Sequence, residues 1–343
     1  MDWGIHMEYY IKKLGHQELG SIKEDGKPSR GRYIYISKNK EVLNFFPPMS
    51  EKVVNDNVVL PIISVELKKK VYCNFVYHND KISRGLSNGR NEYRLYLNND
   101  IEDHQLLFKE NDIIVFKSVQ NEYDNEYSNL YYLLRLSQEN EEDNNTYKML
   151  DKIIEESKLK KGHAVVNEKI DFIEEKINEI ELQENIEIVV PTQVIEKTQE
   201  FIGTTTSIEN LFNSQSFRDF VMVGYGNKCA VTGKSIVWKK FINLEAAHIM
   251  PKSHNGTYMP NNGLALSRDI HWAFDKGFFT INDDYTIKVH EELLDTYLGE
   301  FEGKKINLPE NPFFVPNKES LRYHRENIFG LFKYSGRIMS VNN

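Results

Sequence analysis

The chain has 343 residues, of which 40% are hydrophobic and 27% are charged. This composition is typical of a globular protein of about two domains. No apolar run approaches the roughly 20 residues that span a bilayer, and residues 1–6 lack the basic and apolar pattern of a secretion signal. We therefore expect a cytoplasmic protein with no membrane partner. The two cysteines are too few for a disulfide scaffold or a four-cysteine zinc site.

Taken alone, the net charge of −8 disfavours a polyanionic partner. However, residues 139–200 contain 17 acidic and only 8 basic residues, so the acidic surplus lies in one middle segment. The regions on either side are close to neutral. Either of them can therefore contact a nucleic acid.

Residues 1–138 are predicted to be β-rich. Aromatic and β-branched runs alternate with turn-rich stretches, which favours a β-barrel or sandwich over helices. The predicted strands cover residues 32–36, 42–46, 59–66, 71–78, 92–97, 112–116 and 131–136.

Residues 139–207 are predicted to be an acidic helical linker. Apolar residues at 166, 170, 173, 177 and 180 form a short seam with the spacing of a coiled coil. Two interpretations remain open, namely a helix packed on its own chain and a dimerisation helix. Residues 181–207 read as a connector with breaks at Pro191 and at 203–207.

Residues 208–343 contain the motifs that indicate chemistry. In chain order they are CAVTG at 229–233, LEAAHI at 244–249, NNGLAL at 261–266 and HWAFDKG at 271–277. The apolar positions around His248 predict a strand that ends at Pro251, and Asn262-Gly263 predicts a turn before a second strand at 264–266. Ser267 is a suitable cap for a short helix that stops at Gly277.

These residue types suit phosphodiester hydrolysis. His271 and Asp275 are four residues apart, so they share one face of the helix and can hold a divalent cation. A histidine on the opposite strand would face that ion, and a neutral imidazole can take a proton from water. An asparagine can bond a backbone carbonyl of the histidine loop and thereby orient the histidine.

Residues 229–289 resemble the HNH (ββα-metal) endonuclease family, since four motif elements occur in its order and spacing. The resemblance implies that His248 is the general base, that Asn262 orients it, and that His271 and Asp275 are metal ligands. It also implies one divalent metal ion, with Mg²⁺ expected and Mn²⁺ as the alternative. The expected fold is therefore α+β and multidomain, with the limits 1–138, 139–207 and 208–343.

The chain departs from many relatives of this family at two positions. Ala247 stands where a metal ligand often precedes the base, so a further ligand would come from Glu245, His254, water or the phosphate. Cys229 lacks companion cysteine pairs, so no structural zinc is expected.

The first domain resembles the B3-like pseudobarrels of some transcription factors and restriction enzymes. The similar segments are RYIYI at 32–36, NEYRLY at 91–96 and FKENDIIVF at 108–116. Such barrels grip the DNA major groove with two loops, and arginine suits guanine edges and phosphates. The predicted DNA-binding residues are Lys27, Arg30, Arg32, Lys81, Arg84, Arg90, Asn91 and Arg94.

The leading hypothesis is a type II restriction endonuclease of phage defence that cuts double-stranded DNA as a homodimer. An alternative is a modification-dependent nuclease that reads a methylated or hydroxymethylated base. Two further alternatives are a DNA-binding protein with an inactive HNH fold, which the missing ligand at Ala247 motivates, and a nonspecific nuclease.

Overall fold

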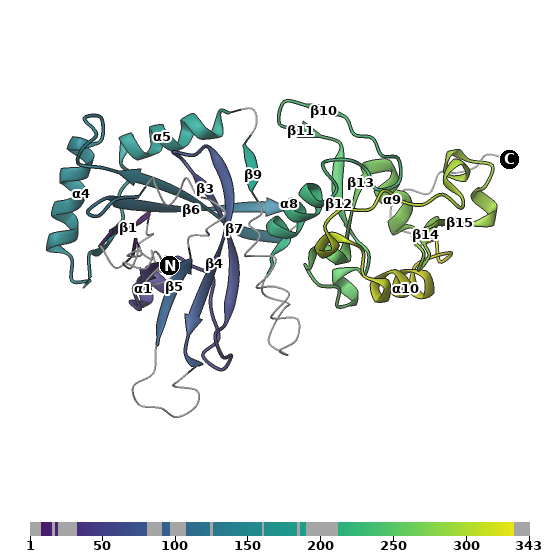
Figure 1. Cartoon of the computed structure of the whole chain (residues 1–343), viewed down its shortest axis with the longest axis horizontal. Coiled ribbons are helices and arrows are strands. Elements are labelled where there is room, and N and C mark those ends of the chain that lie inside the picture. Colours follow the sequence, from purple (N-terminus) through teal and green to yellow (C-terminus); the bar gives the residue numbers. More distant parts are fainter. Residues whose placement is uncertain are drawn as a thin grey trace, which may run out of the picture. The chain divides into compact units, whose positions relative to one another are not determined.

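The chain consists of two compact units, Met1–Gln215 and Ser216–Asn343 (Figure 1). None of the helices in the described part of the chain is long and apolar enough to cross a bilayer. This computed structural model describes residues 8–15, 18–19, 33–80, 91–96, 108–123, 126–159, 161–183, 186–189 and 212–332.

A curled β-sheet dominates the first unit (Figure 1). Its strand order is β2-β5-β4-β3-β7-β6-β1-β8, and β9 pairs with β4 off this path. Neighbouring strands are antiparallel except β3 with β7 and β4 with β9. Six of the seven predicted strands are present, whereas β1, β8 and β9 were not predicted. The bounds are β1 Tyr9–Lys13, β2 Tyr33–Ile36, β3 Asn57–Ser64, β4 Lys69–His78, β5 Glu92–Tyr96, β6 Ile113–Tyr123, β7 Glu126–Leu136, β8 His163–Val166 and β9 Glu187–Val189.

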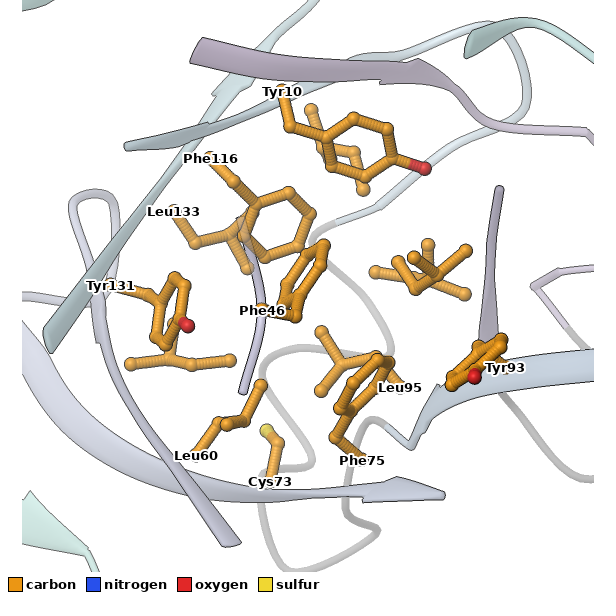
Figure 2. Close-up of a cluster of buried hydrophobic side chains, with 14 of the residues drawn as sticks. Tyr10, Phe46, Leu60, Cys73, Phe75, Tyr93, Leu95, Phe116, Tyr131 and Leu133 are labelled. Carbon is orange, nitrogen blue, oxygen red and sulfur yellow. The ribbon is translucent and has the colours of Figure 1, made fainter. Parts of the chain in front are cut away.

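The inner face of the sheet encloses an aromatic core (Figure 2). Successive side chains of a strand point to opposite faces, so alternate residues of β4 such as Cys73 and Phe75 lie in this core. Phe46 packs among them, with its ring stacked on Tyr131 at a centroid distance of 5.6 Å. Burial of these large rings is the main stabilising contribution to this face.

The predicted strand at 42–46 is wrong. Residues Lys40–Leu43 form the short helix α1, and the side chain of Asn39 accepts a hydrogen bond from the backbone N–H of Glu41. Val42, Phe45 and Phe46 are buried on one side of this turn. A short apolar run fits a helical turn as well as a strand, and here the cap decides between them.

Two helices, α4 (Asn144–Glu156) and α5 (Asp171–Glu181), cover the outer face of the sheet. Ile173, Ile177 and Ile180 of α5 are buried in a second core that also contains β-strand residues. Val166 of the predicted seam lies in β8 instead, which pairs with β1. The isoleucine spacing is therefore satisfied within the chain. The predicted helical linker is not confirmed, and neither is the B3-like pseudobarrel. The mixed α+β class is confirmed.

The second unit is built around a ββα arrangement. Strand β12 (Leu244–His248) pairs antiparallel with β13 (Gly263–Ser267), which places His248 opposite Gly263. Helix α9 (Arg268–Asp275) follows β13 directly. This is the predicted order of strand, loop, strand and helix. The other described helices and strands of this part of the chain are α8 Ser214–Gly224, β10 Val237–Trp238, β11 Phe241–Ile242, η1 Lys252–His254, η2 Pro260–Asn262, β14 Phe279–Ile281, β15 Ile287–Val289, η3 Glu291–Leu293, η4 Tyr297–Phe301, η5 Pro312–Phe314 and α10 Lys318–Asn327.

Both ends of α9 show how it is held. Ser267 occupies the predicted cap position, but its side chain makes no capping hydrogen bond and its hydroxyl lies 3.9 Å from the sulfur of Cys229. Gly277 has a φ of +73°, and a Cβ there would lie 2.1 Å from the carbonyl oxygen of Ile328. Only glycine therefore allows the helix to end in this left-handed turn.

Candidate active site

His248 lies at the end of β12, inside an aromatic enclosure. Phe217 of α8 stacks on its ring with centroids 4.1 Å apart and an interplanar angle of 16°, and Tyr258 meets it edge-on at 5.4 Å. Its Nε2 atom is buried and has no hydrogen-bond partner. A Cβ at Gly263, the cross-strand neighbour, would lie 2.8 Å from the ring of Phe217. Glycine at 263 therefore permits the close approach of α8.

The enclosure keeps the imidazole of His248 neutral. Burial is the main cause that lowers its pKa from 6.5 to about 4, and electrostatic interactions with Lys252 and His271 act in the same direction. At neutral pH the ring therefore carries no charge and can accept a proton. This electrostatic state is the one required of a general base.

Asn262 clamps the loop that follows His248. Its Oδ1 accepts a hydrogen bond from the N–H of Met250 at 3.0 Å, and its Nδ2 donates to the carbonyl oxygens of Met250 and Thr257, also at 3.0 Å each. The side chain is 3% exposed. Gly256 lies within this loop, where a Cβ would come within 1.8 Å of the carbonyl oxygen of Met250. The asparagine thus ties both ends of a tightly folded loop to one side chain.

Two carboxylates, of Glu245 and Asp275, lie close to the imidazole of His271 where α9 packs against β12. Nδ1 of His271 lies 2.8 Å from Oε2 of Glu245, and Nε2 of His271 lies 3.4 Å from Oδ2 of Asp275. The other oxygen of Glu245 lies 3.2 Å from Nε of Arg268. Glu245 shares a face of β12 with Ala247, because side chains two residues apart in a strand point the same way.

This donor set fits a divalent cation. Carboxylate oxygens and imidazole nitrogens are ligands of Mg²⁺ and Mn²⁺. With Nδ1 of His271 bonded to Glu245, Nε2 is the nitrogen directed toward Asp275, and their 3.4 Å separation is longer than an ordinary hydrogen bond. Within the described ranges, no group of three or more such side chains is already arranged around a common ion position. His271 and Asp275 are thus the pair best placed to hold the metal, with Glu245 beside them.

A cavity of about 380 Å³ is lined by residues of β12 and of α9, although neither Glu245 nor His271 is among them. Its lining includes His248 from β12, Trp272 and Asp275 from α9, and Lys276. The cavity also touches His324, whose ring nitrogens contact Thr280 and the carbonyl of Phe274, so that histidine is held by the core. His248, Asp275 and Lys276 therefore line one space.

The structure places only two of the eight predicted DNA-binding residues. Asn91 accepts hydrogen bonds from Tyr77 and Lys38. Arg94 is 8% exposed, pairs with Glu92, and lies over the ring of Tyr33. A DNA contact of Arg94 would have to replace that pairing, and the contact stays a prediction. The remaining six, Lys27, Arg30, Arg32, Lys81, Arg84 and Arg90, lie outside the described residues.

One feature of the site was not predicted from the sequence, and another was left open. Phe217 lies 31 positions before His248 in the sequence, and no local pattern links it to that ring. Glu245 was one of several open choices, and strand alternation with Ala247 could have favoured it. Cys229 is fully buried, and His254 lies next to Tyr323 rather than in the His271 cluster.

Two antiparallel strands and the helix that follows them form a ββα arrangement, with His248 at the end of the first strand and His271 and Asp275 on the helix. Residues 229–282 match the protein family described as HNH endonuclease. This match confirms the predicted resemblance of that segment to the HNH endonuclease family. Among solved structures, "Modification dependent TagI restriction endonuclease" is 24% identical over 35% of this chain and 39% of that chain, with a TM-score of 0.27. No curated protein matches the chain.

Proposed function

We propose that the second unit hydrolyses phosphodiester bonds of double-stranded DNA and that the first unit selects the target, as in a type II restriction endonuclease. The main support is that an imidazole kept neutral by burial lines the same cavity as Asp275 of α9. The match of residues 229–282 to HNH endonucleases supports the same chemistry.

In the proposed reaction, water attacks phosphorus and the bond from phosphorus to the 3′ oxygen breaks. His248 takes the proton of the attacking water, which its low pKa allows at neutral pH. Asn262 acts as a positioning residue, because it fixes the backbone two residues after the base. Lys276, at the cavity wall, attracts the phosphate.

His271 and Asp275 would hold the divalent cation, Mg²⁺ or Mn²⁺. When bound, that ion neutralises charge on the phosphoryl oxygens and on the leaving oxygen. Glu245 contacts the nitrogen of His271 that faces away from Asp275, so it orients the ring for this role. Cutting both strands of a symmetric site requires two active sites, which favours a homodimer.

The test compares the full chain with His248→Ala on a defined plasmid, with and without Mg²⁺. We expect discrete fragments from the wild type and no cleavage by His248→Ala, which should still fold and bind DNA although loss of the ring packed on Phe217 lowers its thermal stability. His290→Asn is the matched control, because it alters a histidine of the same unit outside the cavity and keeps an N-cap acceptor.

The same assay separates the alternatives when it is run on methylated, hydroxymethylated and unmodified DNA. Cleavage restricted to modified DNA would favour the modification-dependent nuclease. A smear would favour a nonspecific enzyme. Binding without any metal-dependent cleavage by the wild type would refute the hydrolytic proposal and leave a DNA-binding protein.

A further inference from the structure

The hairpin formed by β10 and β11 exposes an unusual amount of apolar surface. Ile236, Val237, Trp238 and Phe241 are 72%, 58%, 64% and 60% exposed. Trp238 and Phe241 are cross-strand partners, and their rings are nearly parallel with centroids 6.0 Å apart. Large apolar side chains gathered on one surface element usually mark a binding surface.

The charge of this hairpin is uniformly positive. Lys239 and Lys240 form its two-residue turn, and Lys234 precedes it, whereas residues 232–244 contain no acidic residue. All three lysines are exposed, and the ammonium group of Lys239 lies 5.2 Å from the ring of Trp238. Lys239 also adopts a φ of 53°, which favours glycine or asparagine in such turns. Lys239 therefore places a cation at the tip of the hairpin although its backbone conformation favours other residue types.

The hairpin is anchored directly to the active-site elements. The backbone N–H and the side-chain oxygen of Asn243 bond the carbonyl and the N–H of Ile236, which closes the base of the hairpin. The carbonyl of Asn243 accepts from the N–H of Arg268, the first residue of α9. Strand β12, which carries Glu245 and His248, begins at the next residue. The hairpin therefore projects from the junction of the two elements that form the site.

We propose that the hairpin 236–242 is a DNA-contacting wedge that binds the duplex beside the scissile phosphate. Trp238 and Phe241 pack against bases, and Lys239 and Lys240 contact flanking phosphates. Duplex DNA fits better than an acidic protein because stacked aromatic rings next to lysines suit bases next to phosphates. The inference rests on the proposed function only in assuming that DNA occupies the adjacent site.

Binding is measured on the full chain without metal, so that cleavage plays no part. The probe is a fluorescent duplex, and anisotropy is recorded over a range of salt concentrations. We expect Trp238→Ala and Phe241→Ala each to weaken binding by about fivefold or more, the lower limit of base–aromatic stacking. Replacing Lys239 and Lys240 by glutamine should reduce the slope of log affinity against log salt by about 1.8 for two lost phosphate contacts.

Two matched controls come from the same unit. Lys304 and Lys305 are another exposed lysine pair, and Tyr297 is a ring of similar exposure (53%) that also contacts a phenylalanine. Replacing these lysines by glutamine, or Tyr297 by alanine, should leave affinity and salt slope unchanged. Photocrosslinking of a 5-iodouracil duplex should map to Trp238 or Phe241.

Three outcomes would overturn the proposal. The first is that hairpin and control variants lose affinity for DNA equally. The second is that the duplex crosslinks only to residues outside the hairpin. The third is that hairpin variants bind DNA normally but change a dimer into a monomer. The last outcome would make the hairpin a contact between two copies of the chain. A wild type that binds through the hairpin but never cuts would refute the proposed function alone, whereas normal cutting and binding by hairpin variants would refute this inference alone.

Discussion

Replacing Asn262 by alanine tests how the loop after His248 is held in place. The change removes three hydrogen bonds at once, to the N–H and carbonyl of Met250 and to the carbonyl of Thr257. At about 1 kcal/mol net for each bond, the ordered loop loses about 3 kcal/mol relative to open forms. Since 1.4 kcal/mol is a factor of ten, the correctly positioned loop becomes up to about 10²-fold less populated.

We expect the single-turnover cleavage rate of Asn262→Ala to fall by up to about 10²-fold, while the affinity for DNA changes little. Hydrogen exchange should accelerate at Met250 but not in the β12–β13 ladder, which would show that the unit remains folded. Asn282→Ala is the control, because that side chain makes one hydrogen bond to Thr286 in another turn. Wild-type cleavage by Asn262→Ala together with faster exchange at Met250 would refute the positioning role. Unchanged exchange would refute the clamp itself.

Three further predictions concern buried groups. An NMR titration of the metal-free chain should give His248 a midpoint near 4. Lys252→Gln should raise this midpoint only slightly, because burial is the main cause of the low pKa. A midpoint near 6.5 would show that the His248 ring is not buried. Burial also lowers the pKa of His163 to about 3, so the unfolded state binds the proton more readily and stability falls as pH drops from about 6.5 toward 3. In urea unfolding, His163 should lower the free energy of unfolding by about 2–3 kcal/mol between pH 7 and pH 4.5. His163→Gln should make the free energy of unfolding less dependent on pH. An unchanged pH dependence would exclude His163 as its source. Gly263→Ala places a Cβ 2.8 Å from the ring of Phe217, so it should destabilise the unit by about 1–3 kcal/mol and slow cleavage, whereas wild-type stability would mean that α8 moves freely.

The sequence predicted the ββα core well because its signals are local. Asn262 ends a short 3₁₀ turn and Gly263 opens the second strand in an extended conformation, the two strands are short apolar runs, and Gly277 ends the helix at a positive φ. The four-residue spacing of His271 and Asp275 places them on one helix face whatever surrounds the helix. These features depend on neighbours within a few positions, so periodicity and turn chemistry reveal them.

The first unit was predicted less well for a physical reason. The run at 42–46 is apolar enough for either a strand or a helical turn, and the side chain of Asn39 decides for the turn. The isoleucines of α5 have coiled-coil spacing, yet a sheet can fill the same stripe, and here it does. Pattern shows that a face must be buried, but it does not show what covers it.

For the candidate site, the sequence by itself determined the chemical groups and their local geometry: His248 on a strand, Asn262 before the turn, and His271 with Asp275 on one helix. Only the tertiary structure decided that Phe217 stacks on His248 and that Glu245 contacts His271. Those contacts join residues far apart in the chain, and so does the burial that lowers the pKa of His248. Burial is a property of the packed unit, which is why a linear pattern could name the candidate base but not its protonation state.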